Sequence, residues 1–316
     1  TDSSCPALLL EPLRTNLATL SEYFAGWSNV INVTATSNYI TSPEGVQNAT
    51  RSQFTANGYL YNTNAPAQVA GTQYTLSCYA KRNDSGTQSF GFFKNGSGGV
   101  DSAMALTSEW KRFYYTYTAA TTSQLGLAGL SGADVSIYGF QAEIGSYATS
   151  YIPTYGMSVT RNGELNSATG VSSLIGQTEG TMFVDVNFNG ANETISQTSM
   201  FIRTAGANTG YIFINFYQGK LNCGLRVAGS TLFDSFQTGV LSDGRYKIAF
   251  AYKSGDIAIY VNGVQEETRT NTFGTTSYAE IHLSGVSGNQ LGDKHNQAMV
   301  FPTRLSNSEL ATLTTI

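Results

Sequence analysis

Paired carboxylates are the first chemistry to look for, because retaining glycosidases place two of them about 5–5.5 Å apart across the scissile bond. The sequence has no Glu-x-Asp-x-Glu on a strand-like segment. Glu266 and Glu267 are adjacent, so an extended backbone points them to opposite faces. Glu280 and His282 share one face, but a solvated strand face explains that pair equally well. We therefore expect no enzymatic activity.

Cysteine and histidine are too few for most metal or nucleophile chemistry. The three cysteines, Cys5, Cys78 and Cys223, lie far apart, and no Cys-x-x-Cys or His-x-x-x-His spacing exists. Structural zinc is therefore not expected. Cys78 and Cys223 fall at apolar positions of strand-like segments, where a free thiol behaves as a small hydrophobic side chain.

Aspartates in turn-like settings are the remaining metal candidates: Asp101, Asp134, Asp234, Asp256 and Asp293. Calcium takes such oxygen ligands together with backbone carbonyls. Aspartate in a Gly-rich turn usually hydrogen-bonds its own backbone, and the chain has no Asp-x-Asp-x-Asp. We expect no cofactor and leave calcium open.

Aromatic side chains give the strongest binding signal. The chain has 19 Tyr, 17 Phe and 2 Trp, so tyrosine, which combines an apolar ring with a hydroxyl, dominates. Strand alternation places Tyr79, Arg112 and Tyr114 opposite the expected core, and Trp27 lies in a loop-like stretch. These four residues form a candidate glycan-binding set. The alternative is structural, since β-sandwiches also carry tyrosine on solvated faces.

Composition excludes two classes of partner. Charged residues make up 12% of the 316 residues, the net charge is −4, and basic runs stop at pairs such as Lys81-Arg82. Nucleic-acid binding needs several Lys and Arg against phosphates and is not expected. The apolar run Ala7-Leu8-Leu9-Leu10 is far short of the roughly 20 residues of a membrane span, so we expect no membrane insertion. The chain lacks an initial Met, and we expect a piece of a longer protein.

Two sets of alternating segments must position these residues. The first set comprises residues 73–80, 90–93, 111–118 and 135–140, with Tyr74, Leu76, Cys78, Phe113, Tyr115 and Tyr117 inward. The second set comprises residues 182–188, 211–217, 221–227, 245–252 and 257–261. Hairpins are expected at Gln218-Gly219 and at Asn262-Gly263, where both central residues tolerate positive φ. Half-buried strands at this spacing are typical of antiparallel sandwiches.

Helix is expected only at the edges. Ser306 and Glu309 fit a capping box, which predicts a short C-terminal helix from about residue 307. Residues 17–24 could form one or two further turns. The gap at residues 145–179 shows little alternation and reads as a linker. We predict an all-β chain of two tandem antiparallel β-sandwich (jelly-roll) domains, residues 1–160 and 161–316.

Several segments resemble known families. In the first half these are Cys5–Leu17, Tyr74–Lys81, Trp110–Phe113 and Gln141–Thr154; in the second they are Asp243–Ala249, Ile259–Gly263 and Phe301–Ser306. The first and last segments of the first half resemble fibre- or spike-type virion proteins of phages that infect Bacteroidetes. The first half as a whole looks like a jelly-roll carbohydrate-binding module. The second half is similar to concanavalin A-like or laminin-G-type lectin domains.

This resemblance implies a function. It implies a non-catalytic adhesin on the virion surface, outside the host cell, that binds host-surface glycan and contacts other virion proteins. A fibre would also imply a homo-oligomer, most simply a trimer. Two alternatives stay open: an accessory glycan-binding module of a secreted polysaccharide-degrading enzyme, and a purely structural virion decoration domain.

Overall fold

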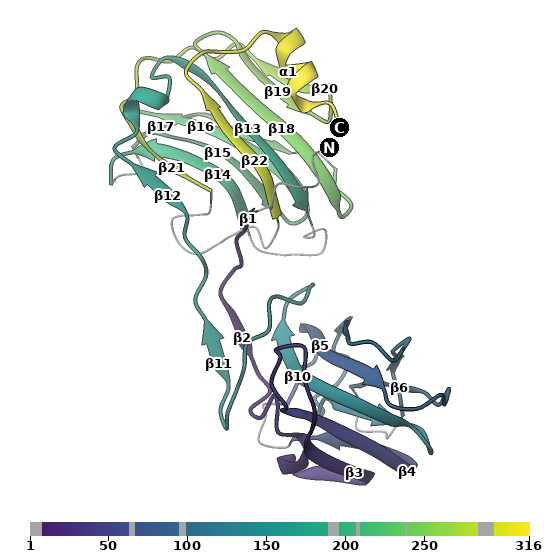
Figure 1. Ribbon diagram of the computed structural model, residues 1–316. Helices are drawn as coiled ribbons and strands as arrows, with labels where there is room; N and C mark the ends of the chain where they lie inside the picture. Colours follow the sequence, from purple (N-terminus) through teal and green to yellow (C-terminus); the bar gives the residue numbers. More distant parts are fainter. Residues whose placement is uncertain are drawn as a thin grey trace. The chain divides into compact units, whose positions relative to one another are not determined.

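The computed structural model describes residues 8–62, 67–94, 99–188, 196–206, 209–237, 239–283 and 294–316 (Figure 1). The chain divides into two compact units. The N-terminal unit is Arg14–Arg161; the C-terminal unit combines residues 8–13 with Asn162–Ile316. Every described strand pair is antiparallel, and the all-β prediction with a short C-terminal helix is confirmed. No helix within the described part of the chain is long and apolar enough to span a membrane.

Most of the N-terminal unit is one eight-stranded hydrogen-bonded sheet that folds over its own core. Its strands are β3 (Asn29–Ile40), β4 (Ala49–Tyr61), β5 (Gln73–Arg82), β6 (Phe90–Phe93), β7 (Ser102–Ala103), β8 (Lys111–Thr118), β9 (Gly126–Gly129) and β10 (Asp134–Ile144). The first part of β4 pairs with β10, and its last part pairs with β9. This long strand therefore joins the layer β10-β5-β8 to the layer β9-β6-β7.

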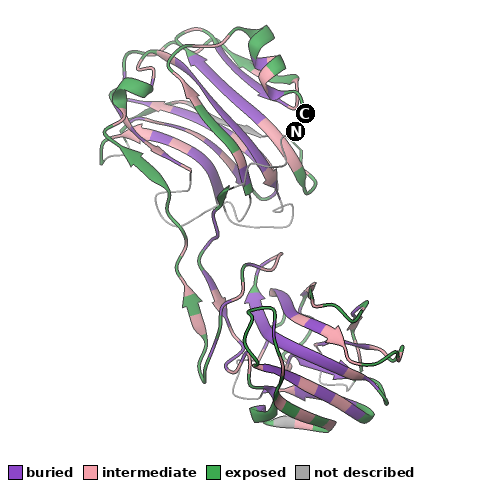
Figure 2. Ribbon diagram, viewed as in Figure 1, coloured by how far each residue is buried: buried purple, intermediate pink, exposed green. Residues whose placement is uncertain are grey.

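The core of this unit follows the predicted alternation. Leu76, Cys78 and Ile137 of one layer pack in the same cluster as Phe92 and Leu127 of the other. All five side chains are buried. Figure 2 shows buried stretches along the strands of this unit. Burial raises the pKa of the Cys78 thiol, so this cysteine is an inert core residue, as expected.

The C-terminal unit is a sandwich of two six-stranded sheets. The front sheet is β12 (Ser167–Thr169), β21 (Tyr278–His282), β14 (Ser196–Thr204), β15 (Tyr211–Tyr217), β16 (Lys220–Val227) and β17 (Ser230–Gln237). The helix-backed sheet is β1 (Leu8–Leu9), β22 (Lys294–Phe301), β13 (Glu179–Phe188), β18 (Gly244–Lys253), β19 (Ile257–Val261) and β20 (Val264–Arg269). Met182, Val184, Ile212 and Ile214 lie in the core between them.

The C-terminal helix covers the outer face of the helix-backed sheet. Helix α1 (Asn307–Thr314) begins with the predicted capping box, in which the Ser306 hydroxyl accepts from the Glu309 N–H. Its Leu310 packs with Phe183 and Tyr260, on the face opposite the core. Both predicted hairpins are confirmed by their left-handed turn residues: φ is 50° at Gln218 and 50° at Asn262, each followed by a positive-φ glycine.

Two local expectations are corrected. The expected helical turns at residues 17–24 are reduced to a 3-10 turn, η1 (Phe24–Gly26). The preceding residues are held extended because the Leu17 N–H donates to Ala142 O and Leu20 bridges Tyr155. The gap at residues 145–179 is not structureless, since it contains β11 (Val159–Arg161), β12 and a 3-10 turn, η2 (Ser172–Leu174).

The division of the chain lies at Arg161/Asn162, close to the expected position, but the start of the chain differs from the expectation. Leu8 and Leu9 pair with His295 and Lys294 of β22, which draws residues 8–13 into the C-terminal unit. The chain then enters the N-terminal unit through β2 (Arg14–Asn16), which pairs with β11. Cys5 lies outside the described residues.

Candidate functional site

Two of the four predicted site residues lie side by side on the outer face of the N-terminal unit. Tyr79 of β5 stands directly opposite Arg112 of β8 on one side and Tyr138 of β10 on the other. The Arg112 guanidinium carbon is 5.6 Å from the centre of the Tyr79 ring, and the Tyr79 and Tyr138 rings are 6.2 Å apart. Strand register thus builds a row of neighbouring side chains across three strands, with the Tyr79 and Tyr138 rings tilted by 43°.

The third predicted residue, Tyr114, shares this face and is the most accessible of the set. It lies opposite Ser77 of β5, and 71% of its surface is exposed. The Ser77 hydroxyl also accepts from Arg112 Nη2 at 3.0 Å, which holds the guanidinium over Tyr79. We call Tyr79, Arg112, Tyr114 and Tyr138 the tyrosine face.

Two glutamates close one end of the row. The Tyr138 hydroxyl donates to Glu44 at 2.5 Å and to Glu22 at 3.3 Å. The Tyr151 hydroxyl donates to Glu22 at 3.1 Å, and its ring lies 5.5 Å from that of Tyr138. The Asn48 amide bridges Glu22 and Glu44 at 3.3 and 3.5 Å. This acidic end therefore combines hydroxyl donors with carboxylate acceptors in one cluster.

Chain segments far apart in the sequence bring this cluster together. The bridge between Leu20 and Tyr155 places Glu22 beside the segment that follows β10. Glu44 lies in the turn between β3 and β4, where the Ser42 N–H donates to Val46 O. Gly139 has φ of +64°, and a Cβ there would lie 3.2 Å from the Tyr151 ring. Glycine is therefore needed where the strand bulges under this ring.

The phenols of the cluster are held in their neutral form. Burial, reinforced by Glu44, raises the pKa of Tyr138. Burial also raises the pKa of Tyr151, and the nearby charge of Glu22 acts in the same direction. These hydroxyls thus remain hydrogen-bond donors at neutral pH, next to carboxylates that only accept. Tyr138 is 2% exposed and keeps its hydroxyl on the glutamates, whereas Glu44 is exposed and can accept a hydrogen bond from a polyhydroxylated ligand.

Trp27 is not on this face, and its assignment to the site is corrected. Its side chain is 5% exposed, with ring centres 5.0 Å from Phe24 and 5.2 Å from Phe140. Its indole N–H donates to Leu20 O at 2.7 Å. Both the Trp27 ring and its indole N–H therefore have their partners inside the core, next to the 3-10 turn η1, and neither is available to a ligand.

The outer face of the front sheet is a second aromatic surface, and it differs in chemistry. Phe201, Tyr211 and Phe213 alternate with core residues, and the Phe201 and Tyr211 ring centres are 5.5 Å apart. The Arg226 guanidinium carbon is 5.7 Å from the centre of the Tyr211 ring. We call this surface the front face. It comprises Phe201, Tyr211 and Phe213 together with Glu280 and its partners Arg203, Gly206 and His282.

The charged groups of the front face are paired with one another. Glu280 accepts from Arg203 Nε at 2.6 Å and from the Gly206 N–H at 2.9 Å, and it lies 3.1 Å from His282 Nε2. The Gly206 N–H, the Arg203 guanidinium and the His282 ring lower the pKa of Glu280 to about 2. The predicted shared face of Glu280 and His282 is confirmed, and the pair belongs to an internal ion network.

The described calcium candidates are engaged elsewhere. Asp134 accepts from Arg51, Asn83 and Gln53, and the bond from Arg51 lowers the pKa of its carboxyl. Asp101 accepts from the Lys94 N–H, and Asp256 accepts from Arg304. Asp293 and the side chain of Asp234 lie outside the described residues. Within the described ranges, no three His, Cys, Asp or Glu side chains gather as a metal site.

Comparisons with known proteins give structural similarity alone. No family model and no curated protein matches the chain. A Ruminococcus gnavus IT-sialidase CBM40 bound to α2,3-sialyllactose is 16% identical, with a TM-score of 0.40, covering 48% of this chain and 97% of its own. Leech intramolecular trans-sialidase is 16% identical with a TM-score of 0.38, covering 45% and 24%. A pentraxin of Limulus polyphemus is 17% identical with a TM-score of 0.35, covering 44% and 70%.

The acidic end of the row has no signature in the sequence. The alternating pattern places Tyr138 only within a strand, and Glu22, Glu44 and Tyr151 carry no local signal. Their clustering depends on the bridge at Leu20 and on the bulge at Gly139, and both are tertiary features.

Proposed function

We propose that this chain is a non-catalytic glycan-binding protein whose tyrosine face contacts the sugar. The observation that carries the proposal is the exposed Tyr114 ring on the same face as Arg112 and Tyr79, in a row that the buried Tyr138 joins to Glu22 and Glu44. Sugars present apolar C–H faces and hydroxyls, which suit amphipathic rings with convergent polar groups. The row offers both kinds of contact across one sheet.

The two ends of the row favour different sugar groups. Arg112 supplies a planar cation that pairs with a sugar carboxylate or hydroxyls. Glu22 and Glu44 accept from hydroxyl donors and repel an anionic sugar. The ligand therefore lies with any acidic substituent toward Arg112 and with neutral hydroxyls toward the glutamates.

A single exposed ring gives the sharpest test. Glycan microarray screening identifies a ligand, and titration calorimetry then compares its affinity for Tyr114→Ala and for Tyr217→Ala, an exposed tyrosine of the C-terminal unit. A stacked ring contributes on the order of 1 kcal/mol, so we expect about fivefold weaker binding for Tyr114→Ala alone. The double variant Tyr79→Ala/Tyr114→Ala should lose about tenfold to a hundredfold. Equal affinities for wild type, Tyr114→Ala and the double variant would refute the proposal.

Absence of catalysis is part of the proposal. Glycosidase carboxylates need the scissile bond between them. The Tyr138 hydroxyl and the Asn48 amide instead bridge Glu22 and Glu44. We expect no reducing or unsaturated ends to be released from a bound polysaccharide. Release that disappears in Glu22→Gln would show a hydrolase or lyase instead.

We further propose that the protein is a fibre or spike segment on a phage virion. The support is the resemblance carried by residues 5–17 and 141–154. Gold-labelled antibody to this chain should decorate intact particles. Unlabelled particles would favour the secreted-enzyme module, whereas labelled particles together with no glycan binding would favour a structural decoration domain.

A weak site becomes useful to a virus through multiple copies. A single site of about millimolar strength corresponds to roughly −4 kcal/mol, and linked copies raise avidity by about 10² to 10⁴. We therefore propose a homo-oligomer, most simply a trimer. Light scattering that finds only monomer at micromolar concentration in the full-length protein would contradict this.

A further inference from the structure

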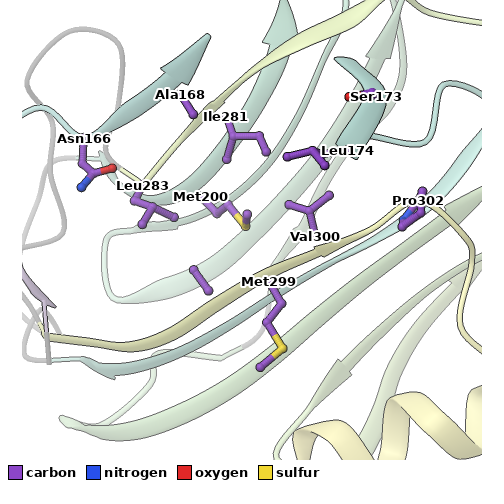
Figure 3. Close-up of a pocket in the computed structure, with 11 residues that line it drawn as sticks. Asn166, Ala168, Ser173, Leu174, Met200, Ile281, Leu283, Met299, Val300 and Pro302 are labelled. Atoms are coloured by element: carbon purple, nitrogen blue, oxygen red, sulfur yellow. The ribbon is translucent and has the colours of Figure 1, made fainter. Parts of the chain in front are cut away.

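An apolar cavity of about 420 Å³ opens on one side of the C-terminal unit (Figure 3). It lies where the edges of the two sheets meet. β12 is the last strand of the front sheet, and on the side away from β13 the described chain pairs β22 with only the two-residue β1. The volume falls in the range of about 300–1,000 Å³ that is usual for small-molecule sites. The cavity shares no residue with the front face.

The lining is suited to an uncharged apolar group. None of the described lining residues is charged. Met200 forms part of the wall and is 1% exposed, while Ile281 and Val300 pack partly against the core. Leu174 and Met299 are 58% and 36% exposed, so the apolar surface continues outward from the cavity. Methionine side chains adapt to irregular apolar ligands.

The shape favours a chain over a ring. Figure 3 shows the lining side chains spread from Asn166 at one end to Pro302 at the other. The short side chains of Ala168 and Ala298 leave space along this path. A sugar would need several convergent polar groups, and the described lining offers only the Asn166 amide and the Ser173 hydroxyl as side-chain partners.

We propose that this cavity binds one alkyl chain, supplied by a free fatty acid or by a membrane lipid. This site is independent of the tyrosine face, and the proposal does not rest on glycan binding.

The test uses the full chain and cis-parinaric acid, a fatty acid that fluoresces when bound. We expect saturable binding of one probe per chain. Ala168→Trp should weaken it at least tenfold by filling the cavity, and Ala298→Trp should act in the same way. Ala120→Trp, at an exposed position of the N-terminal unit, is the matched control and should bind as wild type does. All three positions are exposed, so the melting temperatures should stay close together.

A second arm distinguishes the two sources. Vesicles of phosphatidylethanolamine and phosphatidylglycerol are sedimented with the wild type and with Ala168→Trp. Sedimentation that Ala168→Trp abolishes identifies a membrane lipid; probe binding without sedimentation identifies a free fatty acid. The proposal is overturned if the wild type binds neither, or if Ala168→Trp binds as tightly as the wild type.

Discussion

The tyrosine face and the front face contain the same residue types, but they differ in how their polar groups are paired and in how far their rings are exposed. On the front face, Arg203, His282 and the Gly206 N–H converge on Glu280, and Arg226 donates to Gly229 O beside Tyr211. On the tyrosine face, Tyr114 stands 71% exposed and the row ends on two glutamates that receive phenol hydroxyls. Aromatic and charged residues in a sheet therefore do not by themselves mark a binding surface. What distinguishes the faces is ring exposure, since Tyr114 is 71% exposed whereas Phe201, Tyr211 and Phe213 are each partly buried.

The largest effect should come from breaking the network on the front face. Glu280→Ala leaves Arg203 and His282 without their acceptor, and hydrogen bonds to charged groups contribute about 1.5–3 kcal/mol each. We expect the C-terminal unit to lose about 3 kcal/mol, which corresponds to roughly 6–12 °C in its melting temperature. Calorimetry should show one transition shifting while that of the N-terminal unit and the glycan affinity stay unchanged.

This experiment also tests whether the units fold independently. A shift of both transitions by Glu280→Ala, or a single cooperative transition for the whole chain, would show that they do not. A loss of glycan affinity would place the ligand on the front face and reverse the comparison.

Acid should weaken the C-terminal unit through the same carboxylate. The pKa of Glu280 is about 2 in the folded chain, below the value of about 4.3 expected when it is unfolded. Its contribution is therefore complete above about pH 4.3 and is lost as the pH falls through about 2. Melting curves from pH 6 to 2 should show a smaller acid-induced decrease for Glu280→Gln than for the wild type. An equal decrease in both proteins would contradict this assignment.

A smaller change should show whether the acidic end of the tyrosine face contacts the ligand or only stabilises the fold. Gly139→Ala places a Cβ against the Tyr151 ring at a φ of +64°, which costs about 1–2 kcal/mol. It should also displace Tyr151 from Glu22 and reduce glycan affinity a fewfold. The control is Gly45→Ala, which has φ of +87° but no atom within 4 Å of the new Cβ. If both variants lose stability and neither loses affinity, the acidic end of the row does not contact the ligand.

Local pattern was enough for most of the fold. The alternation of apolar residues correctly predicts that Leu76, Cys78 and Met182 lie in the core, and the Asn262-Gly263 pair correctly predicts a hairpin. The prediction of helical turns at residues 17–24 is wrong because backbone hydrogen bonds from Leu17 and Ser21 to distant segments outweigh the local helix propensity. The pairing of Leu8 with His295 spans nearly the whole chain and has no local signature.

The site was predictable only in part, for the same physical reason. Alternation gives the face of Tyr79, Arg112 and Tyr114, because side-chain direction within a strand is a local property. It cannot show that Trp27 turns into the core, since that depends on Phe24 and Phe140 surrounding it. Nor can it bring together Glu22 and Glu44, which reach Tyr138 from two separate loops.

The smallest and most discriminating change is the same substitution made once on each face. Arg112 lies 5.6 Å from the centre of the Tyr79 ring, and Arg226 lies 5.7 Å from that of Tyr211, so Arg112→Lys and Arg226→Lys are closely matched. Lysine keeps the charge and loses the planar fork that stacks on a ring and binds a carboxylate through two bonds. Surface changes of this kind alter stability by about 0.5 kcal/mol or less. If the ligand meets the tyrosine face, Arg112→Lys should weaken its affinity about twofold to fivefold in titration calorimetry, and Arg226→Lys should leave it unchanged. Equal losses would mean that both faces bind sugar, and a loss with Arg226→Lys alone would move the site to the front face. Because neither substitution disturbs the fold, each outcome reports on contact with the ligand and separates the two faces directly.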